Sequence, residues 1–167
     1  MAFRKTFFSA ALVLFVAVNG ASAQEATFST KSMTPETALK LASATLNACR
    51  DMGYQAAVSV VDRSGLEQVM LRDRFAGPHT PETAWRKAWS AVSFRTNTSD
   101  MLETTKAGNP QAGIRHLDNV AMLGGGMMVM SGGQLIGGVG VSGAPGGEAD
   151  DACALKGIAA IEDLLEF

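Results

Sequence analysis

A glycine-rich stretch, Leu123–Gly143, constrains the fold more than any other part of the chain. Two apolar runs in it, Met127–Met130 and Leu135–Val141, flank Gly132-Gly133. A two-residue glycine loop supplies the positive φ angles that a tight turn needs, so the stretch predicts a β-hairpin. Both faces of the hairpin are apolar, and we expect both to be covered.

Direct pairing across the turn places Met130 opposite Leu135 and Val129 opposite Ile136. Because strand side chains alternate, this register divides the hairpin into two faces. One predicted face carries Met128, Met130, Leu135, Val139 and Val141. The other predicted face carries Met127, Val129, Ile136, Gly138, Gly140 and Ser142. Glycine within a strand marks close approach of either a packed backbone or a ligand, and both interpretations stay open.

The first 23 residues have the order of a secretory signal peptide. Arg4 and Lys5 precede an apolar run from Phe7 to Val18, and Ala21-Ser22-Ala23 forms a small-x-small cleavage site. We expect cleavage after Ala23 and a periplasmic or secreted protein. A membrane anchor is disfavoured because the apolar run is too short to span a bilayer comfortably. The remaining residues 24–167 are expected to form a single domain.

Charge and cysteine usage exclude several function classes. The chain has a formal charge of −2, and loss of the signal peptide, which holds no acid, removes Arg4 and Lys5 and leaves −4. Such a chain without a basic cluster argues against nucleic acid or anionic membrane as partners. Cys49 and Cys153 lie outside CxxC and CxxCH motifs, which disfavours zinc ribbons, thioredoxin chemistry and covalent haem. They are either a bridge between two predicted helices or two buried thiols.

The remaining patterns predict an α+β fold. Thr34 and Pro35 open a helix that ends at Gly53, and the runs 56–61 and 66–71 form a second hairpin across Asp62–Gly65. Thr80 caps a second helix, a short helix lies around 99–106, and a last helix follows Gly147. With a short strand near 120–123, we expect a central antiparallel sheet of about five strands with flanking helices.

Two catalytic motifs can be set aside. Gly138–Gly143 matches GxGxxG, but we expect no parallel strand after the last helix, so dinucleotide binding is disfavoured. Gly140–Ala144 nearly matches GxSxG, but its last glycine is missing and both histidines precede the serine. No HExxH, paired-carboxylate or Cys/His zinc spacing occurs.

The candidate site residues are two loop histidines and nearby arginines. His79 is favoured, because an anionic ligand would find countercharge from Arg72, Arg74 and Arg86 nearby in the sequence. His116 is the competing candidate.

Trp85 and Trp89 lie four residues apart and share a helix face. They are either ordinary core or a wall for a planar ligand.

Five segments resemble the GlcG/HbpS-like family, which includes the C-terminal domain of PduO-type corrinoid adenosyltransferases. They are Asp62–Gly65, Arg72–Thr80, Arg86–Trp89, Gly124–Gly126 and Ile136–Gly143. The resemblance covers roughly Pro35 to Leu165. It implies a profilin-like α/β/α domain that assembles as oligomers and binds haem or a related tetrapyrrole, in haem sensing, storage or breakdown.

Three functions follow as hypotheses. The preferred one is an exported protein that binds haem b non-covalently with His79 as the iron ligand, with a corrinoid as the less favoured ligand. The others are an enzyme that uses His79 and the arginines on a small anionic substrate, and an oligomeric accessory protein. We expect a homo-oligomer, because helices on one sheet face would leave apolar side chains open on the other.

Overall fold

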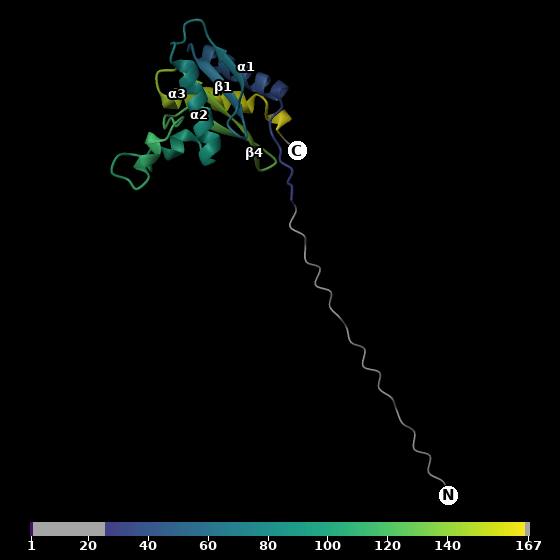
Figure 1. The fold of residues 1–167 in the computed structure, drawn as a ribbon. Coiled ribbons are helices and arrows are strands. Elements are labelled where there is room, and N and C mark those ends of the chain that lie inside the picture. Colours follow the sequence, from purple (N-terminus) through teal and green to yellow (C-terminus); the bar gives the residue numbers. More distant parts are fainter. Residues whose placement is uncertain (2–25, 166–167) are drawn as a thin grey trace.

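The computed structural model describes Met1 and residues 26–165, so the predicted signal-peptide cleavage site lies outside the described residues. Four strands form one antiparallel sheet in the order β2-β1-β4-β3, and three α-helices pack against it (Figure 1). The helices are α1 (Pro35–Asp51), α2 (Thr80–Phe94) and α3 (Gly147–Ala159). The strands are β1 (Ala57–Asp62), β2 (Glu67–Arg72), β3 (Gly126–Ser131) and β4 (Gln134–Ser142). Short 3₁₀ turns are η1 (Thr98–Met101), η2 (Ala112–His116) and η3 (Glu162–Leu164).

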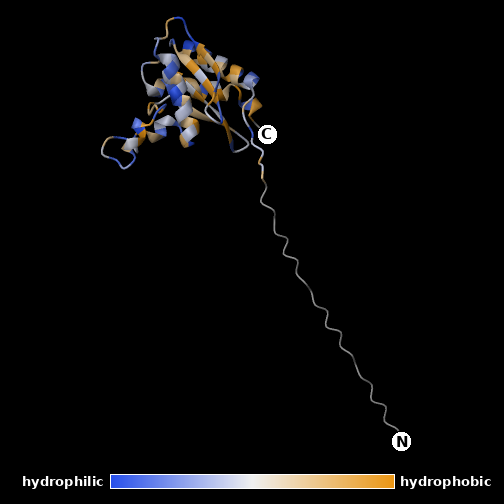
Figure 2. Cartoon of the chain, viewed as in Figure 1, coloured by the Kyte–Doolittle hydropathy of each residue, from blue (hydrophilic) through white to orange (hydrophobic). Residues whose placement is uncertain are grey.

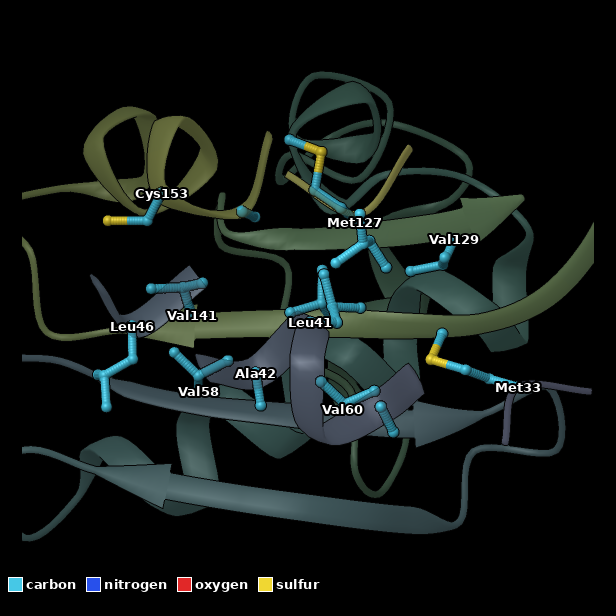
Figure 3. Packing of buried hydrophobic residues seen from close by; sticks show 14 of the residues in the cluster. Met33, Leu41, Ala42, Leu46, Val58, Val60, Met127, Val129, Val141 and Cys153 are labelled. Carbon is cyan, nitrogen blue, oxygen red and sulfur yellow. The ribbon is translucent and has the colours of Figure 1, made fainter. Parts of the chain in front are cut away.

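The sheet lies between two helical layers. Helices α1 and α3 cover one face, where Leu41, Val58 and Val141 belong to the main core (Figure 3). Helix α2 covers the other face and packs through Ala88 and Val92 on Val61 of β1. The loop that projects from the domain between η1 and η2 consists largely of polar residues (Figure 2). Among the described residues, no helix has both the length and the apolar character needed to cross a bilayer.

Glycines of β3 and β4 serve close helix packing. A Cβ atom at Gly140 would lie 1.9 Å from the Ala84 carbonyl oxygen of α2, and one at Gly126 would lie 2.3 Å from that of Lys87. Side chains at these positions would push α2 away from the sheet. Of the two interpretations of these glycines, the structure has close approach of a packed backbone.

The predicted faces of the β3–β4 hairpin are wrong for most of β3. Met130 pairs with Leu135 as expected, but Val129 pairs with Gly137, so Ile136 is an extra residue in β4. Such a bulge shifts the register by one, and a one-residue shift moves each side chain to the opposite face. Met127 and Val129 therefore join the core under α1 and α3, while Met128 lies opposite Gly138.

Cys49 and Cys153 form a disulfide between α1 and α3, with their Cα atoms 5.1 Å apart. The two helices also approach closely at Gly157, where a Cβ atom would lie 1.9 Å from the Thr45 hydroxyl. The sequence left a bridge and two buried thiols as alternatives, and the structure has the bridge.

The prediction that Thr80 caps the second helix is wrong: Thr80 is the first residue of α2, His79 occupies the N-cap position, and the Thr80 hydroxyl donates to the Gly77 carbonyl oxygen at 2.8 Å.

The other expectations hold with small differences. Thr34 caps α1 by accepting a hydrogen bond from the Thr37 amide at 3.3 Å, as expected. The sheet has four strands rather than about five, because residues 120–123 form no strand. Trp85 packs against the cluster under α2. Trp89 packs against a cluster that includes Met101 and Met122. The two tryptophans therefore serve packing.

Candidate functional site

A cleft of about 1030 Å³ lies at one end of the sheet. There β4 ends, β1 begins, and helices α2 and α3 both have their N-termini. The antiparallel order brings these four ends together from distant parts of the sequence. Apolar walls come from Tyr54, Phe75, Leu102 and Leu123, and Gly143–Gly147 forms a further wall.

His79 lies on the lining of this cleft, at the N-cap position of α2. Its side chain is exposed and makes no capping hydrogen bond, while its carbonyl oxygen accepts from the Thr83 hydroxyl at 2.9 Å. The preceding loop holds the ring closely, since a Cβ atom at Gly77 would lie 2.7 Å from His79 Cε1. The imidazole is thus positioned by the loop and remains available to a ligand.

The other predicted site residues do not line the cleft. The guanidinium of Arg72 donates to the Ala76 carbonyl oxygen, and Arg86 pairs with Glu82 one turn earlier on α2 at 2.7 Å. Arg74 is exposed in the loop before α2. His116 is exposed at the end of η2, in the projecting segment. Whether any of these residues contacts a ligand stays a prediction.

The floor of the cleft holds a buried ion pair that the sequence analysis missed. Lys87 Nζ lies 2.7 Å from Asp150 Oδ2 and donates to the Val141 carbonyl oxygen at 2.8 Å. The two side chains are only 3% and 5% exposed, yet both residues line the cleft. Asp150 Oδ1 also accepts from the Ala144 amide at 3.0 Å. The pair therefore ties α2 to α3 and to the loop after β4.

Burial raises the pKa of the Asp150 carboxyl above its ordinary value of 3.8. The Lys87 charge and the hydrogen bonds from Lys87 and Ala144 act in the opposite direction, and Asp151 adds to the increase. Removal of the carboxylate from water outweighs the attraction of its partner, as is common for buried ion pairs.

A second carboxylate shapes the mouth of the cleft. Asp151 accepts hydrogen bonds from the Ser99 hydroxyl and from the Gly125 amide. Gly125 has φ +111°, a conformation that favours glycine, and a Cβ atom there would lie 2.6 Å from the Val141 carbonyl oxygen. The glycines before β3 thus let the chain pass close to the acids of α3.

The charges of the cleft limit what it can bind. Of the described lining residues, only His79 and Lys87 are basic, while Glu148, Asp150 and Asp151 are acidic. No group of three or more His, Cys, Asp or Glu side chains suited to a metal ion occurs among the described residues. The cleft therefore suits a ligand with an apolar body that accepts one nitrogen donor, and it offers no free cation for an anionic group at its floor.

Solved structures share this fold over most of the chain. HbpS of Streptomyces reticuli, solved as a double mutant, has a TM-score of 0.72 and 34% identity and covers 90% of this chain and 98% of its own. The complex of PduOC with heme has a TM-score of 0.74 and 32% identity, covering 78% of this chain and 95% of that chain.

Sequence comparison also finds a relative among the PduO proteins. Corrinoid adenosyltransferase PduO of Salmonella typhimurium is 35% identical over 106 residues, which cover 62% of this chain but only 32% of that protein. The family model described as "Haem degrading protein HbpS-like" matches residues 33–159. The chain belongs to the HbpS-like family.

Proposed function

We propose that this protein is an exported haem-binding protein that holds haem b non-covalently in the cleft, with His79 as the iron ligand. One observation carries the proposal: the cleft of a fold whose relative PduOC was solved with heme presents an accessible imidazole on its lining. Neutral imidazole is a common haem ligand. A corrinoid is the less favoured ligand.

The lining residues fit the apolar part of a tetrapyrrole. Phe75 and Leu123 are 80% and 54% exposed, which is unusual for large apolar side chains unless they meet a ligand or partner. Tyr54 and Leu102 extend this surface. Because acids lie near the start of α3, the floor of the cleft would not suit the carboxylates of a tetrapyrrole.

Haem would supply an iron centre for ligand binding or redox chemistry, and the protein would supply position and environment. His79 would donate the nitrogen, and the apolar walls would exclude water from one side of the ring. Lys87 and Asp150 would fix the floor, because they join both flanking helices. Since Arg72 and Arg86 already have partners, the arrangement does not favour an enzyme that uses them with His79 on an anionic substrate.

A titration of haemin into purified protein tests the proposal. We expect a saturable Soret shift in wild type, a changed spectrum and weaker binding in His79→Ala, and wild-type behaviour in His116→Ala, the matched control. No specific Soret shift in wild type would refute haem binding. If only His116→Ala loses the spectrum, haem binding stands and His79 is the wrong ligand.

Export is part of the proposal and rests on the order of residues 1–23. N-terminal sequencing of the mature protein from its native host should begin at Gln24. An exported fraction that still carries Met1 would contradict cleavage after Ala23.

We also propose a homo-oligomer, on a surface that differs from the expected one. The sheet face expected to be open is covered by α2. Exposed apolar side chains instead gather beside the β3 edge, where Met130 and Leu155 are 41% and 55% exposed around a shallow groove. An edge strand with apolar neighbours favours association. Light scattering at micromolar concentration should give a multiple of the monomer mass.

A further inference from the structure

A second groove, of about 490 Å³, lies at the opposite end of the sheet from the cleft. There β1 ends at Asp62, β4 begins at Gln134 and α2 ends at Phe94. The chain before α1 crosses this end and is joined to it by a hydrogen bond from the Met33 amide to the Ile136 carbonyl oxygen at 2.9 Å. The groove is lined by Phe28–Thr30, Arg63, Arg95, Met128, Met130 and Gly133–Leu135.

The walls of this groove are apolar and partly open to water. Met128 and Leu135 are half-buried, Met130 is 41% exposed and Phe28 is 86% exposed. Methionine side chains adapt their shape to flexible apolar ligands. The groove therefore offers a surface for a hydrocarbon chain.

Two arginines, Arg63 and Arg95, supply positive charge to the groove. Neither the Arg63 nor the Arg95 side chain has a hydrogen bond or ion pair to any described residue, and no described residue that lines the groove is acidic. By contrast, Arg50 pairs with Asp73 and Arg86 pairs with Glu82. A guanidinium fork matches a carboxylate, so the two free arginines favour an anionic group.

The backbone of Arg95 adds a second, independent reason. Arg95 ends α2 in the left-handed conformation, with φ 51°. Glycine or asparagine occupies such a helix end with less strain. Backbone strain of this kind is retained at functional sites, and the Arg95 side chain lines the groove.

We propose that this groove binds an amphipathic carboxylate, such as a fatty-acid-like anion. The carboxylate pairs with Arg63 and Arg95, and the hydrocarbon chain lies along Met128, Met130 and Leu135. This site is separate from the proposed haem site, because the cleft and the groove share no lining residue.

The test is a fluorescence titration with 11-(dansylamino)undecanoate, which brightens in an apolar site. Wild type should bind it saturably, and the uncharged methyl ester should bind much more weakly. The variant Arg63→Gln/Arg95→Gln should lose about tenfold or more in affinity, because both charge-assisted contacts disappear. Its matched control is Lys40→Gln/Lys156→Gln, which removes two positive charges from α1 and α3 and should bind like wild type.

A further variant separates binding from folding. Arg95→Gly should bind the probe more weakly while its unfolding midpoint is unchanged or raised, because glycine relieves the strained backbone.

Equal affinity in the double arginine variant and wild type, or no saturable binding by wild type, would overturn the proposal. So would loss of probe binding in His79→Ala, which would place the probe in the cleft. Oligomer dissociation by the double arginine variant without any probe binding would instead assign the groove to a second copy of the chain. Haemin titration of the same variants reports on the haem proposal separately, since either site can fail alone.

Discussion

At the scale of single residues, the Lys87–Asp150 pair has the largest expected effect on stability. Its members are 63 positions apart in the sequence and almost fully buried. Removal of one member of such a pair leaves an uncompensated buried charge, whereas removal of both does not. The contribution of the pair therefore appears in the comparison of single and double variants.

We predict that Lys87→Met lowers the free energy of unfolding at neutral pH by about 3–5 kcal/mol. Lys87→Met/Asp150→Asn should recover part of this loss, because the buried carboxylate is gone. Urea unfolding of the three proteins measures both effects. A double variant less stable than Lys87→Met would contradict the assignment.

The raised pKa of Asp150 predicts a pH dependence. Because the folded-state pKa lies above the ordinary value of 3.8, the folded protein holds this proton to higher pH than the unfolded chain does. The contribution of Asp150 to stability is therefore greatest below the ordinary value and is lost as pH rises through the raised one. The stability of wild type relative to Asp150→Asn should decline as pH increases across this window. A rising or flat difference in denaturant unfolding would show that the pKa is not raised.

The burial of Lys87 could have been predicted from the sequence. Ala84, Lys87, Ala88 and Ala91 follow the spacing of one buried helix face, and the structure buries all four. A lysine in such a row indicates a buried partner. Its identity could not be predicted, because only the folded chain brings α3 next to α2. The position of His79 just before a helix start, by contrast, is a local feature that the sequence indicates.

At the scale of elements, α2 packs very closely on the glycine face of the sheet. We predict that Gly140→Ala destabilises the protein by about 1–3 kcal/mol or more, because its Cβ atom would meet the Ala84 carbonyl oxygen. The matched control is Gly113→Ala, where an added Cβ meets nothing within 4 Å and stability should change by less than about 0.5 kcal/mol. Equal thermal midpoints for Gly140→Ala and wild type would show that α2 can move away at no cost.

The disulfide joins the two helices of the other layer. It closes a loop with a sequence separation of 104, so its loss should lower the free energy of unfolding by about 2–5 kcal/mol. Unfolding with and without a reducing agent measures this, and Cys49→Ser/Cys153→Ser should be insensitive to the agent. An unchanged midpoint on reduction of wild type would contradict the prediction.

At the scale of the whole molecule, the hairpins, the helix order and the α+β class could be read from the sequence. Turn glycines, caps and alternation are local, and Thr34, Gly65 and Gly133 act as expected. The register of β3 could not be read, because a bulge depends on which side chains the opposing layers accept. The cleft was also beyond reach, since it forms from four element ends that are distant in the sequence.

The bulge at Ile136 changes the register of the β3–β4 pair by one residue, so the two ends of the hairpin pair in different registers. Beyond the bulge, Met127 and Val129 of β3 lie in the core under α1 and α3, and Gly126, Gly138 and Gly140 lie against α2. Pairing without the bulge would set Ile136 opposite Val129 and Met127 opposite Gly138, and would turn Met127 and Val129 toward α2, whose backbone already lies against the neighbouring glycines. The one extra residue in β4 is therefore as much a part of the information for this fold as the chemistry of its side chains.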